Sequence, residues 1–67
     1  MSVVKIIEVK SSSPKSFEEA IQKGLSKTGK TVKNLQSAWI KEQEVDLKKD
    51  GTINEYRVLM KVTFLVE

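Results

Sequence analysis

Few side chains in this 67-residue sequence could carry out chemistry, because it contains neither cysteine nor histidine. Their absence excludes thiol nucleophiles, Ser-His and Cys-His pairs and the usual zinc ligands. The candidate acids and bases that remain are carboxylates, lysines and Tyr56, and no motif groups them around a pocket. We therefore expect no enzymatic activity.

Trp39 is the only tryptophan, and it lies near the middle of an expected strand. One interpretation makes it a core residue that packs against Phe17 and Val62. The other makes it a stacking platform for a flat heteroaromatic ligand. Such a ligand also needs polar groups that fix its orientation, and Gln43 and Arg57 belong to the same hairpin.

Lysines recur along one side of the helix that is expected after residue 13, at Lys23, Lys27, Lys30 and Lys33. They form either a solvated face that complements the negative helix end, or a patch that binds the phosphate of a nucleotide-like cofactor. Residues 1–41 carry eight lysines against three acids, whereas the rest of the chain is acidic and contains the one arginine. We therefore expect no nucleic-acid partner.

Glu42, Glu44 and Asp46 alternate along one strand and share a face. They could gather a hard cation such as calcium if symmetry brought copies of the chain together. We favour a salt-bridged face instead, with Arg57 and Lys61 as cross-strand partners, because no calcium-binding loop is present.

The first half of the chain predicts a strand followed by a helix. Val3 to Val9 is rich in β-branched residues, and turn-forming residues follow it. Ser13 is expected to be the N-cap, with Pro14 at the first helical position, and Gly29 or Asn34 to end the helix. Gly24 indicates the close approach of another backbone. The apolar stripe comprises Phe17, Ala20, Ile21, Leu25, Thr28 and Val32.

The second half predicts a long antiparallel hairpin, because its apolar period changes to two. Asp50-Gly51 is typical of a two-residue turn, in which glycine accepts a positive φ. The register that follows sets Val45 opposite Tyr56, Trp39 opposite Val62, Leu35 opposite Val66 and, on the other face, Glu44 opposite Arg57.

These elements predict an α+β fold of βαββ topology, a single domain over residues 1–67 in which three antiparallel strands partly wrap around one helix. One helix is too short to cover strands of this length. The residues expected on the uncovered face are Val4, Ile6, Ala38, Ile40, Leu59 and Leu65. A patch of this size predicts a homo-oligomer.

The sequence has no apolar run that is long enough for a transmembrane helix, and no secretory signal. We therefore expect a cytoplasmic protein without a membrane partner.

Three segments, in order and with matching spacings, resemble the dodecins: residues 13–21, 38–43 and 55–64. The resemblance spans nearly the whole chain. It implies a βαββ protein that assembles into a hollow homododecamer and stores or buffers a non-covalently bound flavin, which is FMN, riboflavin or FAD, without turnover.

The resemblance also implies site residues. Trp39 would stack on the flavin ring, bordered by Ser37 at the usual stacking position and by Arg57 at the usual glutamine position, with Gln43 nearby. Lys5, Lys27 and Lys33 fall where some members bind coenzyme A or other phosphorylated ligands. The alternative is the same shell without flavin, acting as a scaffold or as a buffer of ions or coenzyme A, with Trp39 at a subunit interface.

Overall fold

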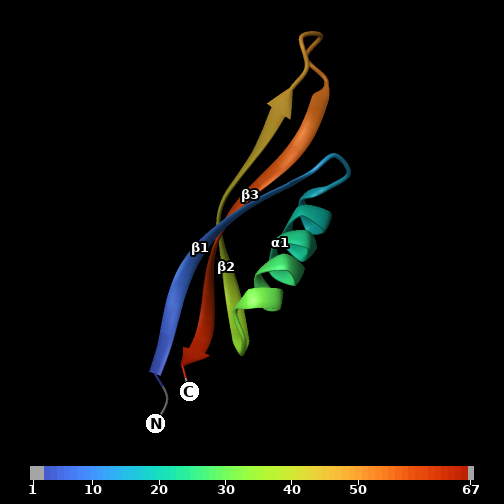
Figure 1. Ribbon diagram of the computed structural model, residues 1–67. Coiled ribbons are helices and arrows are strands. Elements are labelled where there is room, and N and C mark those ends of the chain that lie inside the picture. The colour runs from blue at the N-terminus through green and yellow to red at the C-terminus, as the bar shows by residue number, and fades with distance from the viewer. Residues whose placement is uncertain (1–2, 67) are drawn as a thin grey trace.

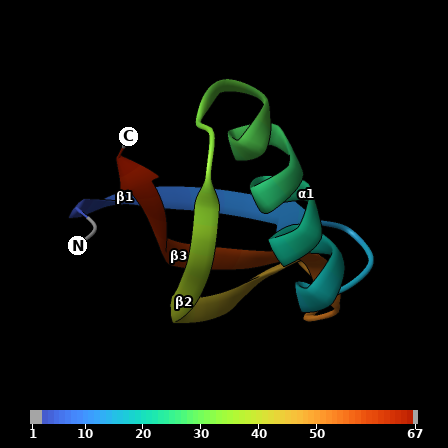
Figure 2. The same ribbon diagram turned by 90° about the horizontal axis from the view of Figure 1, so that it is seen from below.

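The computed structural model describes residues 3–66 and contains one helix and three strands. In chain order these are β1 (Val3–Ser13), α1 (Phe17–Thr31), β2 (Leu35–Leu47) and β3 (Ile53–Val66). The strands form one antiparallel sheet in the order β1-β3-β2, and α1 lies against one face of it (Figure 1, Figure 2). The predicted βαββ fold is thus confirmed.

The core lies between α1 and the central strand β3. Ala20 of the helix and Val58, Met60 and Val62 of β3 are fully buried. Phe17, Ile21 and Leu25 pack around them, as the helical stripe predicts. Every second residue of β3 therefore points towards the helix, and the residues between them point away from it.

Gly24 allows α1 to approach the sheet closely. A Cβ atom at this position would lie 2.8 Å from Cε of Met60 and 3.0 Å from Cβ of Ser11. The close approach that the sequence predicts is present. The atoms nearest to Gly24 belong to side chains of β3 and β1, however, and not to a neighbouring backbone.

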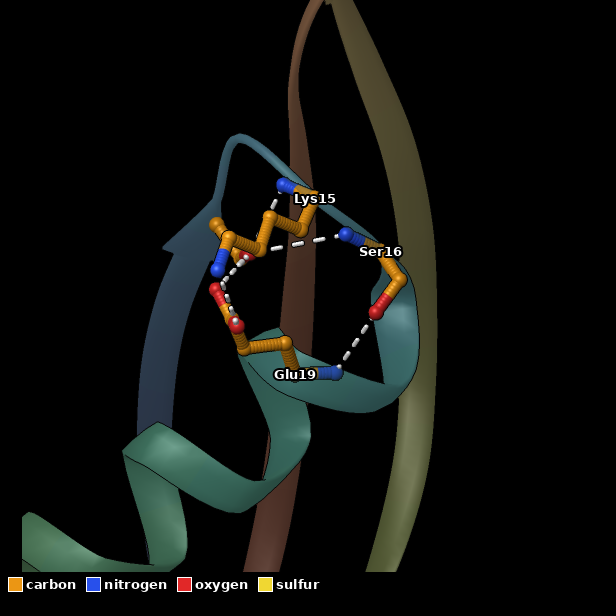
Figure 3. A network of polar contacts seen from close by, with 4 residues as sticks. Lys15, Ser16 and Glu19 are labelled. Atoms are coloured by element: carbon orange, nitrogen blue, oxygen red, sulfur yellow. Dashed lines mark hydrogen bonds and ion pairs between the residues drawn. The ribbon is translucent and has the colours of Figure 1, made fainter.

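The connection between β1 and α1 differs from the prediction. β1 continues to Ser13, because long β3 supplies pairing partners up to Tyr56, and the N-cap is Ser16. The Oγ of buried Ser13 accepts from the backbone N–H of Lys15 at 3.0 Å and donates to Glu19 at 2.5 Å. Ser16 Oγ accepts from the N–H of Glu19 at 2.9 Å (Figure 3). Ser13 therefore anchors the turn from inside and does not cap the helix.

The hairpin turn lies at the predicted place but has one more loop residue. Lys48 N–H donates to the Thr52 carbonyl at 2.8 Å, so the loop consists of residues 49–51, with Gly51 at φ 89°. Thr52 donates to the Asp50 carboxylate through both its N–H and its hydroxyl. These hydrogen bonds, the one from the side chain first, lower the pKa of Asp50 below its ordinary value.

Two irregularities in β2 correct the predicted register. Glu44 does pair with Arg57 and Val45 with Tyr56, but shifts follow between Ile40 and Glu42 and between Leu35 and Ser37. The corrected pairs are Trp39 opposite Lys61 instead of Val62, and Leu35 opposite Phe64 instead of Val66.

The shift at Lys41 also exchanges the faces of neighbouring residues. Ala38 and Ile40, which we expected on the uncovered face, pack against the core. Trp39, for which a core position was one interpretation, is 68% exposed on the face away from the helix. A β-bulge adds one residue to one strand, and the alternation of faces is offset beyond it.

The sheet extends well beyond the helix, as Figure 1 shows for the β2–β3 hairpin. The molecule is 52 Å long, whereas a helix of 15 residues spans about 22 Å. Large apolar side chains are exposed both on the face away from α1, at Val4 and Ile6, and near the hairpin tip, at Leu47 and Ile53. Within residues 3–66 no helix is long and apolar enough to cross a membrane.

Candidate functional site

The sheet face that α1 leaves bare, here called the open face, carries the candidate stacking residue. Its middle row runs across all three strands, from Glu8 of β1 through Lys61 of β3 to Trp39 of β2. Apolar Val4 and Ile6 lie further along β1 on the same face, and both are at least half exposed. The open face thus combines an aromatic ring, charge and apolar surface.

Trp39 contacts a cation within this row. The ammonium of Lys61 lies 5.8 Å from the centroid of the indole ring, which is within the range of a cation–π interaction. Lys61 is half-buried, while most of the indole is accessible to solvent. The indole therefore contacts a cation and leaves a large part of its surface exposed, on which a flat ligand could stack.

A second lysine completes the charged row. Lys41 Nζ lies 3.3 Å from Glu8 Oε2, so this ion pair joins β2 to β1 across β3. Both side chains are about half exposed, and such pairs contribute about 0–1 kcal/mol to stability. The pair neutralises Glu8, and Lys61 makes no ion pair among the residues that the structure describes.

The structure brings Ser37 and Trp39 together. Ser37 is exposed and lies opposite Thr63, one row along the open face from the pair of Trp39 and Lys61. Its hydroxyl can donate to or accept from a ligand that covers the indole.

Arg57 belongs to a different cluster, on the hairpin. It lies four residues from Lys61 along β3, which is about 13 Å. Its guanidinium is 2.9 Å from Glu55, 3.5 Å from Asp46 and 3.9 Å from Glu44. The hydrogen bond to Glu55, followed by the charges of Asp46 and Glu55, raises the pKa of Arg57. Within one protomer Arg57 therefore does not border the indole ring.

Gln43 accompanies Arg57. The two line a hollow of about 460 Å³ together with Lys10, Glu42, Glu44, Val58 and Leu59. Gln43 pairs with buried Val58, so its strand position faces the helix side of the sheet. The strand position of Arg57 alternates with that of Val58 and lies on the other face, although its side chain also lines this hollow.

The lysines that the resemblance assigns to phosphate lie at two places. Lys5 and Lys33 line one hollow of about 370 Å³ at the end of α1, with Asn34 at a φ of 62° in its wall. Lys27 lies instead on a larger groove of about 930 Å³ between α1 and β1, where Lys10, Lys23 and Arg57 are further cations.

The acidic row on β2 is partly salt-bridged, as predicted. Glu44 and Asp46 pair with Arg57, but Lys61 contacts Trp39 and not these acids. In residues 3–66, acidic side chains form no cluster that could hold a metal ion within one protomer.

These features define a small α+β protein with an exposed aromatic and charged sheet face. The family model of the dodecins matches residues 3–67, and the chain belongs to this family. No curated protein sequence matches the chain.

Solved dodecin structures superimpose on nearly the whole chain. The dodecin from Streptomyces davaonensis is 27% identical, with a TM-score of 0.93 over 98% of this chain and 96% of that one. A variant of Thermus thermophilus dodecin is 31% identical, with a TM-score of 0.92 over 100% and 98%. A calcium dodecin from Mycobacterium tuberculosis, described as calcium-chelating with a novel calcium-binding site, is 29% identical, with a TM-score of 0.84 over 98% and 93%.

Sequence reasoning missed the charged neighbours of Trp39. Glu8 and Lys41 were not considered as a pair, and Lys61 was assigned to the acids of β2. The apolar positions Leu35, Ala38 and Ile40 hold a signal for the correct pairing, since spacings of three and two residues cannot lie on one face of a regular strand.

Proposed function

We propose that this chain is a dodecin that binds FMN, riboflavin or FAD non-covalently and stores or buffers it in a cytoplasmic homododecamer, without turnover. The single observation that carries the proposal is the position of Trp39, 68% exposed on the open face with the polar groups of Ser37 and Lys61 beside it. An exposed ring of this kind suits a flat heteroaromatic ligand.

Assembly is part of the proposal. Family membership supports a homo-oligomer, and so does the apolar surface at Val4 and Ile6, which no element of the protomer covers. In an assembly, Arg57 and Gln43 of a neighbouring subunit could reach the ring that they do not reach within one protomer.

A second candidate function is a shell that binds an ion or coenzyme A and no flavin. Lys5 and Lys33 share a hollow that suits a phosphate group. The resemblance to the dodecins places Ser37 at the position where flavin-binding members carry the stacking tryptophan. The acids of β2 offer hard oxygen ligands that symmetry could gather. Under this hypothesis Trp39 packs at a subunit interface.

Titration of riboflavin, FMN and FAD with the protein tests the first proposal. We expect flavin emission to fall on binding, and Trp39→Ala to weaken binding about 5- to 150-fold, because aromatic stacking contributes about 1–3 kcal/mol. Trp39→Phe should retain part of the affinity. Val45→Ala, which shortens another exposed hydrophobic residue of β2, is the control and should bind like the wild type.

The two functions give different results in the same experiments. If flavin emission never changes with the wild type while Trp39→Ala prevents assembly, the flavin proposal is wrong. Calorimetry with coenzyme A, repeated with Lys5→Gln and Lys33→Gln, then tests the second function.

A further inference from the structure

We propose that Lys61 makes the Trp39 surface selective for planar ligands that carry negative charge on or beside the ring. This inference rests on the stacking role proposed for Trp39 and names the chemical class of ligand that the site prefers. Lys61 would be a specificity-determining residue of the site and not a merely structural one.

The geometry fixes the ammonium next to the ligand position. Lys61 and Trp39 are directly paired across β3 and β2, and the ammonium lies 5.8 Å from the indole centroid. A ring that stacks on the face of the indole over which this ammonium lies must either lie beside the ammonium or displace it. In both cases the ligand meets a positive charge at a distance of a few ångströms.

The neighbouring charges leave this cation uncompensated. Glu8, which is opposite Lys61 on β1, is paired with Lys41 at 3.3 Å. Of the hairpin's acids, Glu44, Asp46 and Glu55 are paired with Arg57. Glu42 lies opposite Leu59 in the next row of the open face, and Lys10 of β1 brings a further cation to that row. The row Glu8, Lys41 and Lys61 therefore carries one net positive charge. Among the residues that the structure describes, the ammonium of Lys61 supplies this charge because it has no ion-pair partner.

A neutral ring and an anionic ring of the same shape should consequently bind with different affinities. Any stacked ligand removes water from half-buried Lys61, and only an anion replaces the lost hydration with a charge–charge attraction. For charges this close near a protein surface, we expect a preference of about tenfold for the anion.

Two anthraquinones of nearly equal size test the preference: anthraquinone-2-sulfonate, which is an anion, and neutral 2-(hydroxymethyl)anthraquinone. Trp39 is the only tryptophan, so quenching of its fluorescence, corrected for ligand absorbance, reports binding at this site alone. We expect the sulfonate to bind the wild type about tenfold more tightly, and the difference to shrink in high salt.

Lys61→Met removes the charge and keeps an unbranched side chain. It should abolish the preference by weakening the sulfonate, while the neutral quinone binds as before or better. Lys48→Met, which removes an exposed lysine near the hairpin tip, is the matched control and should keep the preference. Native mass spectra should show that both variants assemble like the wild type.

Equal affinities in the wild type, binding of neither quinone, or a preference that survives in Lys61→Met would each overturn the inference. These results are distinguishable from failure of the proposed function. If the sulfonate binds through Lys61 but riboflavin, FMN and FAD do not, the inference stands and the flavin role is wrong. If the flavins bind and Lys61→Met leaves the ratio of the two anthraquinone affinities unchanged, the flavin role stands and the inference is wrong.

Discussion

Gly24 and Gly29 lie in the same helix but have different surroundings. A Cβ atom on Gly24 would meet Met60 at 2.8 Å and Ser11 at 3.0 Å, whereas a Cβ on Gly29 would meet only Leu35, at 3.7 Å. The first contact is closer than side chains tolerate without movement, and the second is ordinary van der Waals contact. Comparison of alanine substitutions at the two positions therefore distinguishes a packing constraint from the general cost of glycine in a helix.

Gly24→Ala should lower the free energy of unfolding by about 1–2 kcal/mol, because overpacking at Met60 outweighs the gain in helix propensity. Gly29→Ala gains the propensity alone and should raise it by about 0.5–1 kcal/mol. Chemical denaturation at one protein concentration measures both. A stabilised Gly24→Ala variant would show that α1 does not approach β3 as closely as described.

At the level of residues, the sequence indicated which side chains matter better than it indicated where the fold places them. It singled out Trp39 and the pairing of Glu44 with Arg57, and the pairing is confirmed. It could not decide whether Trp39 is buried, because that depends on the face on which the strand presents it. The seven predicted ligand-binding residues remain predictions, and within one protomer they fall into separate groups.

Because Lys41 is bulged out of the pairing between β2 and β3, Trp39 lies on the same face of the sheet as Glu42. Lys41 is inserted between Ile40, which pairs with Met60, and Glu42, which pairs with Leu59. Met60 and Leu59 are adjacent in β3, so removal of Lys41 would make this part of the ladder regular. The bulge thus offers a direct test of the register.

Deletion of Lys41 should give a folded protein in which Ile40 remains inside and Trp39 outside, with a loss of stability of about 1 kcal/mol from the exposed ion pair to Glu8. Deletion of Ile40 yields a chain of the same length but sets Lys41 opposite Met60. It should cost about 2–5 kcal/mol, because the core loses an apolar side chain.

The emission maximum of Trp39 and its quenching by iodide report its exposure in both variants. A blue shift after deletion of Lys41 would contradict the register, because it would mean that the indole had moved to the helix side. This measurement requires no bound ligand and no knowledge of the oligomeric state.

At the level of elements, the order of strands and helix, the hairpin and the apolar stripe of α1 could all be predicted from periodicity and turn residues. The bulge at Lys41 could not, because a bulge changes the pairing of two strands and leaves each strand's own composition unchanged. The spacing of Leu35, Ala38 and Ile40 signals only the irregularity between Leu35 and Ser37. The start of α1 was misplaced for a related reason. Ser13 has the side chain of a cap, but the length of β3 keeps it in the sheet.

The whole molecule exposes more apolar surface than one helix can cover. Ile6, 61% exposed, and Val4 lie on the open face without a neighbour from α1. Because the fold leaves this surface bare, we expect copies of the chain to cover it for one another.

Ile6→Glu should shift the protein from a large assembly towards smaller species, because a carboxylate in an apolar interface loses its hydration. Native mass spectrometry and size-exclusion chromatography at neutral pH measure the change. Ser26→Glu adds the same charge on the exposed surface of α1 and should assemble like the wild type. If the wild type itself is a well-folded 7.6 kDa particle in dilute solution, the assembly is disproved.

The strand order β1-β3-β2 places the last strand of the chain in the centre of the sheet. β1 and β2 do not pair with each other. Each of them pairs with β3, which lies between them. During synthesis, the sheet therefore cannot be completed before β3 has emerged from the ribosome. Until β3 begins to emerge, the nascent chain holds two unpaired strands and a helix without its partner, and unpaired strand edges of this kind favour aggregation.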